Sequence, residues 1–263
     1  MKYLSYTLFI SLSCLYSCNL YDLRQNVPAG INNKKQADPH EIINKCVSAH
    51  GWDHINNAYF TVTYTDQWPN FWFRTFFHPW PDKDKLLKQE FSSKSLYSAE
   101  LTFVEGIRAG EIWGLEDNQP YLVIDDEKKY RRHSNTQFYL PTYQYFFQMP
   151  YWLQQVPILK YLGETTLGEQ NYHLVYGTWQ QETPHEAYDQ YLYWINTETY
   201  FLEIVQYTIR DQMPNAHGTN TFSDFRKVKE LIIPFIQTIT FEPEDEEIMH
   251  QIKIDKIDYQ QLE

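Results

Sequence analysis

Apolar and polar residues alternate along most of the chain, and the clearest case is residues 60–65, which read FTVTYT. A period of two is typical of strands that bury one face of a sheet. Runs of this kind recur at 71–78, 85–92, 97–105, 107–114, 120–133, 158–166, 171–179, 188–195, 200–209, 217–226, 231–241 and 250–260. Turn-forming stretches such as 117–120 and 243–245 separate them. We therefore predict a mainly β (α+β) protein, whose large antiparallel sheet of about eleven strands is curled into an incomplete barrel.

A short amphipathic helix is predicted before the first strand, at about residues 39–50. Asp38 suits the N-cap and Pro39 the first helical position, and Glu41 has a capping-box-like spacing. The apolar residues of the segment fall on one face at helical spacing: Ile42, Ile43, Cys46 and Val47. Gly51 can end the helix in a left-handed conformation. The apolar stripe should face the sheet.

One segment, residues 138–153, breaks the strand pattern. It is long, aromatic and almost free of charge, and Pro141 and Pro150 each suit the first turn of a helix. Two short helices in tandem are therefore predicted. Because the segment is apolar nearly all round, it has to be buried or to meet lipid. It either fills the barrel as core or forms the mouth, floor or flap of a ligand cavity.

If a cavity exists, its lining should come from this insertion and from a nearby strand. The candidate ligand-binding residues are Tyr143, Phe146, Phe147, Trp152 and Leu153 on the insertion, with Leu192 and Trp194 on the strand. All seven side chains are large and apolar, as a site for an acyl chain or another amphipathic molecule requires.

The N-terminus carries a targeting signal. Lys2 precedes an uncharged, mostly apolar stretch, which is shorter than the roughly 20 residues of a spanning helix. The stretch ends in Leu15-Tyr16-Ser17-Cys18, which resembles the cleavage and acylation site of bacterial lipoproteins. We predict a signal peptide over 1–17, lipidation at Cys18, a flexible tether over 18–37 spanning roughly 25 Å, and one domain over 38–263. The alternative is a plain secretory signal cut nearby.

Charge and cysteine content narrow the possible partners. The formal net charge is −12, and loss of Lys2 with the signal would make it more negative. An acidic chain without a basic block argues against nucleic acid and against electrostatic docking to anionic lipid. Membrane contact should therefore come from the acylated Cys18. Cys46 would then be the only cysteine of the domain, so we expect no disulfide and no cysteine-based metal cluster.

The chain shows no motif that names a reaction. Glycine-rich phosphate loops, the nucleophile elbow and the zinc-helix pattern are all absent from the sequence. His50 and His54 have the spacing of two ligands on one helix face, but Gly51 between them should end the helix. A histidine near a helix C-terminus interacting with the dipole is the simpler interpretation. We expect no enzyme activity, no metal and no cofactor.

Together, the signal, the capped helix, the strands and the aromatic insertion resemble the outer-membrane lipoprotein carrier and receptor proteins of the LolA and LolB type. Residues 139–147, with 188–209 after them, also look like uncharacterised bacterial lipoproteins of this fold. The resemblance implies an incomplete antiparallel barrel closed by helices, with an apolar concave face for acyl chains. The chain has 22 tyrosines, and because a buried hydroxyl needs a partner, a purely aliphatic groove does not fit.

These observations lead to a functional hypothesis. We expect a monomeric, non-enzymatic lipoprotein of the cell envelope, at the outer membrane, that binds a lipid, an acyl chain or another amphipathic small molecule in an apolar cavity. The alternative is a surface module that binds carbohydrate or a partner protein through exposed aromatic side chains, or an uncharacterised hydrolase. An enclosed cavity favours the first hypothesis, and a flat exposed aromatic strip favours the second.

Overall fold

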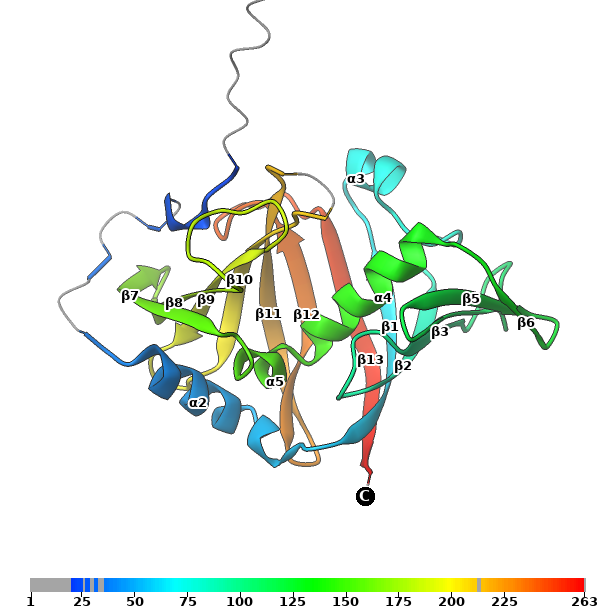
Figure 1. Ribbon diagram of the computed structural model, residues 1–263, viewed down its shortest axis with the longest axis horizontal. Helices are drawn as coiled ribbons and strands as arrows, with labels where there is room; N and C mark the ends of the chain where they lie inside the picture. Colours follow the sequence, from blue (N-terminus) through cyan, green and yellow to red (C-terminus); the bar gives the residue numbers. More distant parts are fainter. Residues whose placement is uncertain (1–19, 26, 29–30, 33–35, 212–213, 263) are drawn as a thin grey trace, which may run out of the picture.

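A computed structural model describes residues 20–25, 27–28, 31–32, 36–211 and 214–262. Its strands form one sheet in the order β6-β5-β4-β3-β2-β1-β13-β12-β11-β10-β9-β8-β7, with antiparallel neighbours throughout. The strands are β1 (Ala58–Gln67), β2 (Leu86–Ser92), β3 (Ala99–Phe103), β4 (Ile112–Glu116), β5 (Gln119–Ile124), β6 (Glu127–Tyr130), β7 (Ile158–Leu167), β8 (Gln170–Thr178), β9 (Gln190–Asn196), β10 (Leu202–Thr208), β11 (His217–Val228), β12 (Leu231–Thr240) and β13 (His250–Gln261). The sheet curls without closing (Figure 1), which confirms the predicted incomplete barrel.

Short helices cover the concave face and one end of this sheet. They are α2 (Pro39–Ala49), α3 (Phe71–Phe76), α4 (Ser134–Phe147) and α5 (Met149–Leu153), with the 3-10 turns η1 (Leu23–Gln25) and η2 (Trp52–His54). The insertion formed by α4 and α5 links the two edge strands, β6 and β7, and crosses in front of the concave face (Figure 1). Helix α2 packs against α5 and β7.

The predicted first helix is confirmed at both ends. The carboxylate of Asp38 accepts a hydrogen bond from the backbone N–H of His40 at 2.9 Å, and Pro39 is the first helical residue. All four residues of the apolar stripe are buried, including Cys46. Gly51 has a φ of 77°, and a Cβ atom at this position would lie 2.2 Å from the carbonyl oxygen of Glu230. Only glycine fits where the helix end meets the β11–β12 hairpin.

The expected strand at 71–78 is wrong, because this segment contains helix α3. Asn70 caps the helix by accepting a hydrogen bond from the N–H of Phe73 at 3.0 Å. A run of aromatic residues fits strand and helix alike, so the local cap decides. The region 120–133 instead contains two strands, β5 and β6, which turn at Asp125 and Asp126, both with positive φ. The sheet therefore has thirteen strands instead of about eleven.

The insertion contains two helices as predicted, but the first begins earlier than expected. Helix α4 starts at Ser134, where the ring of His133 accepts a hydrogen bond from the N–H of Thr136, and Pro141 lies inside it. Proline removes one backbone donor from a helix interior. The carbonyl that loses its donor at Pro141 is that of Gln137, and the hydroxyl of Thr142 donates to the next carbonyl oxygen, that of Phe138, at 2.7 Å. Pro150 does lie at the start of α5, as expected.

The segment before α2 differs from the free tether that was expected over 18–37. Residues 20–25 lie against the sheet, and Leu23 is completely buried. Further along, the backbone of Asn32 pairs with Glu164 of β7. Val27 and Ile31 pack against a small apolar cluster on the convex face. The described part of this segment therefore belongs to the folded domain, whereas Cys18 lies outside the described residues.

Candidate ligand-binding site

The insertion is held on the concave face mainly along one side. The amide of Gln144 on α4 donates hydrogen bonds to the carbonyl oxygens of Ser92 and Ser95, at 2.9 and 2.7 Å. In return, the side chain of Gln89 on β2 donates to the carbonyl oxygen of Leu140 at 2.9 Å. Because Gln89 and Gln144 are both buried, these hydrogen bonds are shielded from water. They attach α4 firmly to the β2–β3 hairpin.

On the other side, the insertion meets the sheet through aromatic rings. Phe146 lies over Tyr207 of β10, with ring centroids 5.0 Å apart, and Tyr145 lies beside Tyr191 of β9 at 5.8 Å. Such contacts are non-directional in comparison with a hydrogen bond to a buried carbonyl. The attachment of the insertion is therefore polar on the β2 side and apolar on the β9–β10 side.

Four of the five predicted ligand-binding residues of the insertion lie together in the core between the helices and the sheet, and Trp152 does not belong to that cluster. Tyr143, Phe146, Phe147 and Leu153 are buried, and Trp152 is half-buried. Phe147 contacts Tyr64 of β1 at 5.2 Å between ring centroids. In this conformation the side chains fill the concave side as core, which is the first of the two roles considered for this segment.

The two predicted strand residues lie elsewhere. Leu192 and Trp194 are on the convex face, in a separate cluster with Tyr172, Leu174 and Ile204. Their neighbours Tyr191, Tyr193 and Ile195 point to the concave side instead. Both faces of β9 are apolar and buried, so alternation alone did not reveal which set of residues faces the insertion. The seven candidates do not form a single surface.

A set of polar side chains that was not predicted from the sequence is buried on the concave side, and we call it the concave polar groups. They are Tyr145, Gln148, Tyr193, Asn220 and Gln237. Both amide atoms of Gln148, Oδ1 of Asn220 and Nε2 of Gln237 are buried without a hydrogen-bond partner among the described residues. The buried hydroxyls of Tyr145 and Tyr193 interact with each other. Asn220 and Gln237 are joined by one hydrogen bond of 3.0 Å. A buried polar atom without a partner costs about 1–3 kcal/mol of folding free energy. These groups would therefore destabilise the protein if the concave side were only a hydrophobic core.

The tyrosines of this region stay neutral. Burial raises the pKa of Tyr193 and of Tyr191 well above the ordinary value, and the neighbouring tyrosine hydroxyls raise both further. A neutral phenol can both donate and accept a hydrogen bond. The concave polar groups are therefore uncharged donors and acceptors surrounded by aromatic rings, an environment that suits an uncharged or weakly polar group joined to an apolar one.

A second buried cluster centres on Asp66 at the end of β1. Its carboxylate accepts hydrogen bonds from four side chains: His250, the hydroxyl of Tyr143 at 2.8 Å, and the indole N–H groups of Trp68 and Trp80 at 3.0 and 2.7 Å. Burial alone would raise the pKa of Asp66. The positive charge of His250 and the hydrogen bonds outweigh that effect and lower it.

This cluster connects β1, β13 and the insertion, because Tyr143 belongs to α4. The ring of Trp68 stacks on His250 with centroids 4.3 Å apart and shields the pair from water. The described contacts of Asp66 and His250 do not include a serine, threonine or cysteine side chain that could act as a nucleophile. The arrangement attaches the insertion to the sheet through a buried carboxylate that accepts four hydrogen bonds.

Other candidate chemistry does not converge. His50 is buried, whereas His54 is exposed and pairs with Asp53 at 3.5 Å. Across the described ranges, no three His, Cys, Asp or Glu side chains come together as a metal site. Nor does any helix in the described part of the chain have the length and hydrophobicity needed to cross a bilayer.

Comparisons with known proteins agree with this fold. A LolA superfamily protein from Nitrosomonas europaea superposes with a TM-score of 0.52 at 9% identity, covering 87% of this chain and 96% of the other. A putative outer membrane lipoprotein-sorting protein domain from Vibrio parahaemolyticus has a TM-score of 0.48 at 8% identity, covering 84% and 92%. The first of these shows that the fold is that of the LolA superfamily, as the resemblance implied.

Sequence comparison gives a family but no activity. A family model described as "Family of unknown function (DUF6503)" matches residues 15–260. Among curated proteins, none is detectably similar in sequence to this chain.

Proposed function

The chain belongs to the family of unknown function DUF6503, and we propose that this member is a lipid-anchored protein of the bacterial cell envelope that binds an amphipathic molecule. The ligand lies between the α4–α5 insertion and the concave face. Its apolar part packs among the aromatic side chains of the insertion, and its polar part bonds to the concave polar groups. The ligand class is a lipid, a fatty acid or a molecule of similar chemistry.

The observation that carries this proposal is the set of concave polar groups. Gln148 is completely buried between α4 and α5, yet neither atom of its amide has a partner. Nε2 of Gln237 and Oδ1 of Asn220 are likewise buried without a partner among the described residues. A ligand with one or two polar groups would satisfy such atoms and remove their cost of about 1–3 kcal/mol each. Each methylene group that it buried would add about 0.8 kcal/mol.

The attachment of the insertion supports a route for the ligand. On the β2 side, buried hydrogen bonds hold α4 through Gln89 and Gln144. On the β9–β10 side, the contacts are between rings, as at Phe146 and Tyr207. Separating rings in the presence of an apolar ligand exchanges one apolar contact for another. The insertion therefore opens on the β9–β10 side and stays attached on the β2 side.

The membrane location rests on the N-terminal signal. Residues 15–18 have the pattern of a lipoprotein cleavage and acylation site, and the family match begins at residue 15. The LolA superfamily fold supports a place in the envelope and an apolar concave binding face. Cys18 would carry the acyl chains.

Replacing Gln148 by leucine tests the binding site. We expect Gln148→Leu to weaken binding of a fluorescent anthroyloxy fatty acid by about tenfold, equivalent to about 1.4 kcal/mol. The free energy of unfolding without ligand should stay the same or rise, because leucine removes two unsatisfied polar atoms. The full chain, extracted from bacterial membranes in mild detergent, is titrated with the probe and then unfolded in urea. Native mass spectrometry of the same preparation should show a bound molecule of lipid mass.

The matched control is Gln181→Leu, since Gln181 is exposed in the loop after β8. It should bind the probe as the unchanged protein does. If the unchanged protein retains no amphipathic molecule and does not bind the probe, the proposed function is wrong. Equal affinity of the Gln148→Leu variant and the unchanged protein would show that the ligand lies elsewhere.

A further inference from the structure

Helix α3 presents an exposed aromatic patch at one end of the domain. The patch consists of Phe71, Trp72, Phe76, Phe77 and Phe241, with exposed fractions of 69, 65, 69, 41 and 45%. None of the residues of α3 is buried, and the helix projects beyond the ends of the central strands (Figure 1). Soluble proteins rarely expose several large apolar side chains side by side, and such patches mark interaction surfaces.

The patch is continuous with the N-terminal segment of the domain through a series of ring contacts. Phe73 on α3 meets Phe241 with centroids 5.5 Å apart, and Phe241 meets His217 at 6.1 Å. His217 in turn stacks on Tyr21 at 4.0 Å, with the two planes only 3° apart. The chain therefore enters the folded domain beside the patch.

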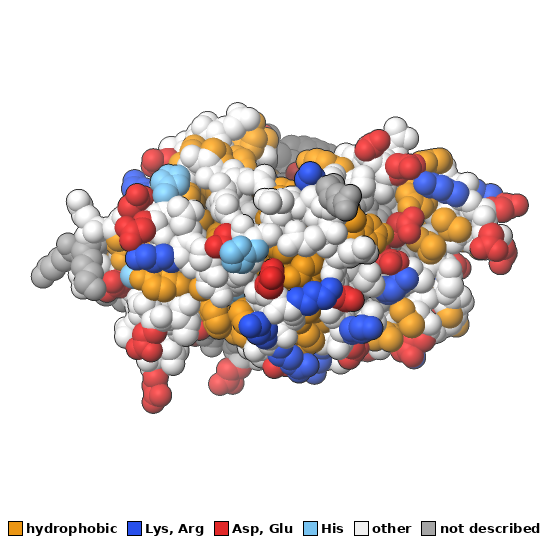
Figure 2. All heavy atoms as spheres, turned by 90° about the horizontal axis from the view of Figure 1, so that it is seen from below, with side chains coloured by type: hydrophobic (Ala, Val, Ile, Leu, Met, Phe, Trp, Pro, Cys, Tyr) orange, Lys and Arg blue, Asp and Glu red, His pale blue; other side chains and the backbone are white. Residues whose placement is uncertain are grey.

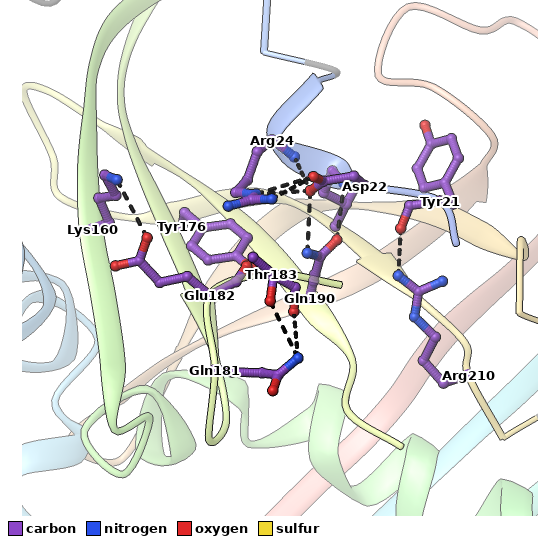
Figure 3. Close-up of polar contacts among 11 residues, drawn as sticks. Tyr21, Asp22, Arg24, Lys160, Tyr176, Gln181, Glu182, Thr183, Gln190 and Arg210 are labelled. Carbon is purple, nitrogen blue, oxygen red and sulfur yellow. Dashed lines mark hydrogen bonds and ion pairs between the residues drawn. The ribbon is translucent and has the colours of Figure 1, made fainter. Parts of the chain in front are cut away.

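The N-terminal segment is fixed at this position by buried polar contacts (Figure 3). The backbone N–H of Leu23 donates to the side-chain oxygen of Gln190 at 3.0 Å, and the amide of Gln190 donates to Asp22 at 3.2 Å. The guanidinium of Arg210 donates to the backbone carbonyl of Tyr21. Tyr21 is thus held in place only three residues after Cys18.

This short distance determines how far the domain can lie from its anchor. Three extended residues span about 10 Å, much less than a free tether over 18–37 would allow. With acyl chains on Cys18, the membrane surface would lie within about 10 Å of Tyr21. Tyr21 and the patch share one end of the domain. The patch would then face the same membrane.

We propose that α3 and Phe241 insert into the interfacial region of the membrane that holds the Cys18 lipid. The proposal rests on the lipid anchor of the proposed function. Tryptophan and other aromatic rings favour the level of the lipid headgroups. The charges beside the patch include the Arg74–Asp84 pair at 3.6 Å and the exposed carboxylates of residues 244–247, of which Glu247 accepts a hydrogen bond from Asn70. The patch would therefore contact the membrane through its rings and not through attraction to anionic lipid. The opposite end of the domain, near α2, shows acidic and basic side chains interspersed with apolar areas (Figure 2).

Contact of α3 and Phe241 with the membrane interface would bring the proposed ligand site close to the bilayer. The hydroxyl of Tyr139 on α4 donates to the backbone carbonyl of Phe77 at 2.7 Å. The patch is therefore bonded directly to the insertion that covers the concave face. A ligand leaving the bilayer would meet α4 without crossing water.

Quenching of Trp72 by brominated lipid tests the proposal. The full, lipidated chain is reconstituted into phosphatidylcholine vesicles whose acyl chains carry bromine near the headgroups. We expect quenching of the tryptophan emission, and we expect Trp72→Phe to remove most of it. The matched control Trp179→Phe, at the half-buried Trp179, should leave the quenching unchanged. Because Trp72 is exposed, its replacement should not affect folding.

The outcomes separate this proposal from the one on which it rests. Mass spectrometry of the Cys18 peptide reports the acyl anchor, and its absence would overturn the anchored location. An acylated protein on vesicles whose Trp72 is not quenched would overturn only the insertion of α3. If the Trp72 emission is blue-shifted without quenching, the patch is covered by protein, and the membrane is not its occupant.

Discussion

Replacing Asp66 by asparagine is expected to lower the free energy of unfolding by several kcal/mol, since each buried donor left without an acceptor costs about 1–3 kcal/mol. The carboxylate accepts hydrogen bonds from His250, Tyr143 and two tryptophans. Asparagine would direct its NH₂ group toward some of these donors and leave them without an acceptor. Urea unfolding, followed by tryptophan fluorescence and by circular dichroism, measures the loss.

The matched control for this change is Asp84→Asn. Asp84 forms an exposed ion pair with Arg74, and exposed pairs contribute about 0–1 kcal/mol. If the free energy of unfolding decreases by the same small amount in both variants, the Asp66 cluster does not hold the insertion on the sheet. The Asp66→Asn variant should also show faster proteolysis within 134–153, because Tyr143 links α4 to Asp66.

Acidification should destabilise the protein through His50. This residue is buried at the end of α2, where its Nδ1 lies 2.9 Å from the carbonyl oxygen of Ile232 and its Nε2 accepts the N–H of Leu202 at 3.0 Å. The ring is therefore neutral, with the proton on Nδ1. Burial lowers its pKa from 6.5 to about 4, although the bond to Ile232 acts in the opposite direction. His50 does lie at the C-terminus of α2, where it contributes through these two hydrogen bonds.

The direction of this pH dependence follows from the pKa values of His50 in the folded and in the unfolded protein. Its folded pKa is the lower one, so the unfolded chain takes up the proton first as the pH falls below about 6.5. The free energy of unfolding should then decrease between pH 6.5 and pH 4, by about 3 kcal/mol in total from this residue. Urea unfolding at a series of pH values measures the slope.

The variant His50→Gln provides the comparison, because glutamine retains a donor and an acceptor but does not titrate. It should lose part of the slope of the unchanged protein between pH 6.5 and pH 4. His54→Gln, at an exposed residue, should keep the full slope. The pKa values of His78 and His133 are also lowered by burial, and these residues contribute equally in all three proteins. Identical slopes for His50→Gln and the unchanged protein would contradict the assignment.

Local patterns were enough to predict the sheet and the first helix. Alternation of period two is a property of the strand itself, because successive side chains point to opposite faces. The helix at α2 could likewise be predicted from Asp38, Pro39 and Gly51, since capping depends on residues a few positions apart. The aromatic run at 71–78 has the composition of a strand, so α3 was predicted as a strand, and the cap at Asn70 decides the outcome.

The candidate site depended on contacts that a local pattern does not contain. Strand β9 is apolar on both faces, and only the curvature of the sheet decides that Tyr193 faces the insertion while Trp194 faces away. The amide of Gln148 is notable only because it is buried without a partner. The residues next to Gln148 in the sequence do not indicate that its amide is buried without a partner.

The sequence by itself determined the half-barrel and the aromatic insertion, because each is written in consecutive residues, and the signal that ends at Cys18 stays a prediction from the sequence. Only the tertiary structure decided how these parts meet. It brings Asp66 to His250 across 184 positions and attaches Leu23 to Gln190 across 167. Such pairs form when segments that are distant in sequence become neighbours in the fold and their buried polar groups form hydrogen bonds. The spacing of the two residues in the sequence does not predict which pairs will form. The attachment of Leu23 makes residues 20–25 part of the folded domain in place of a free tether, and ring contacts through His217 and Phe241 connect Tyr21 to α3.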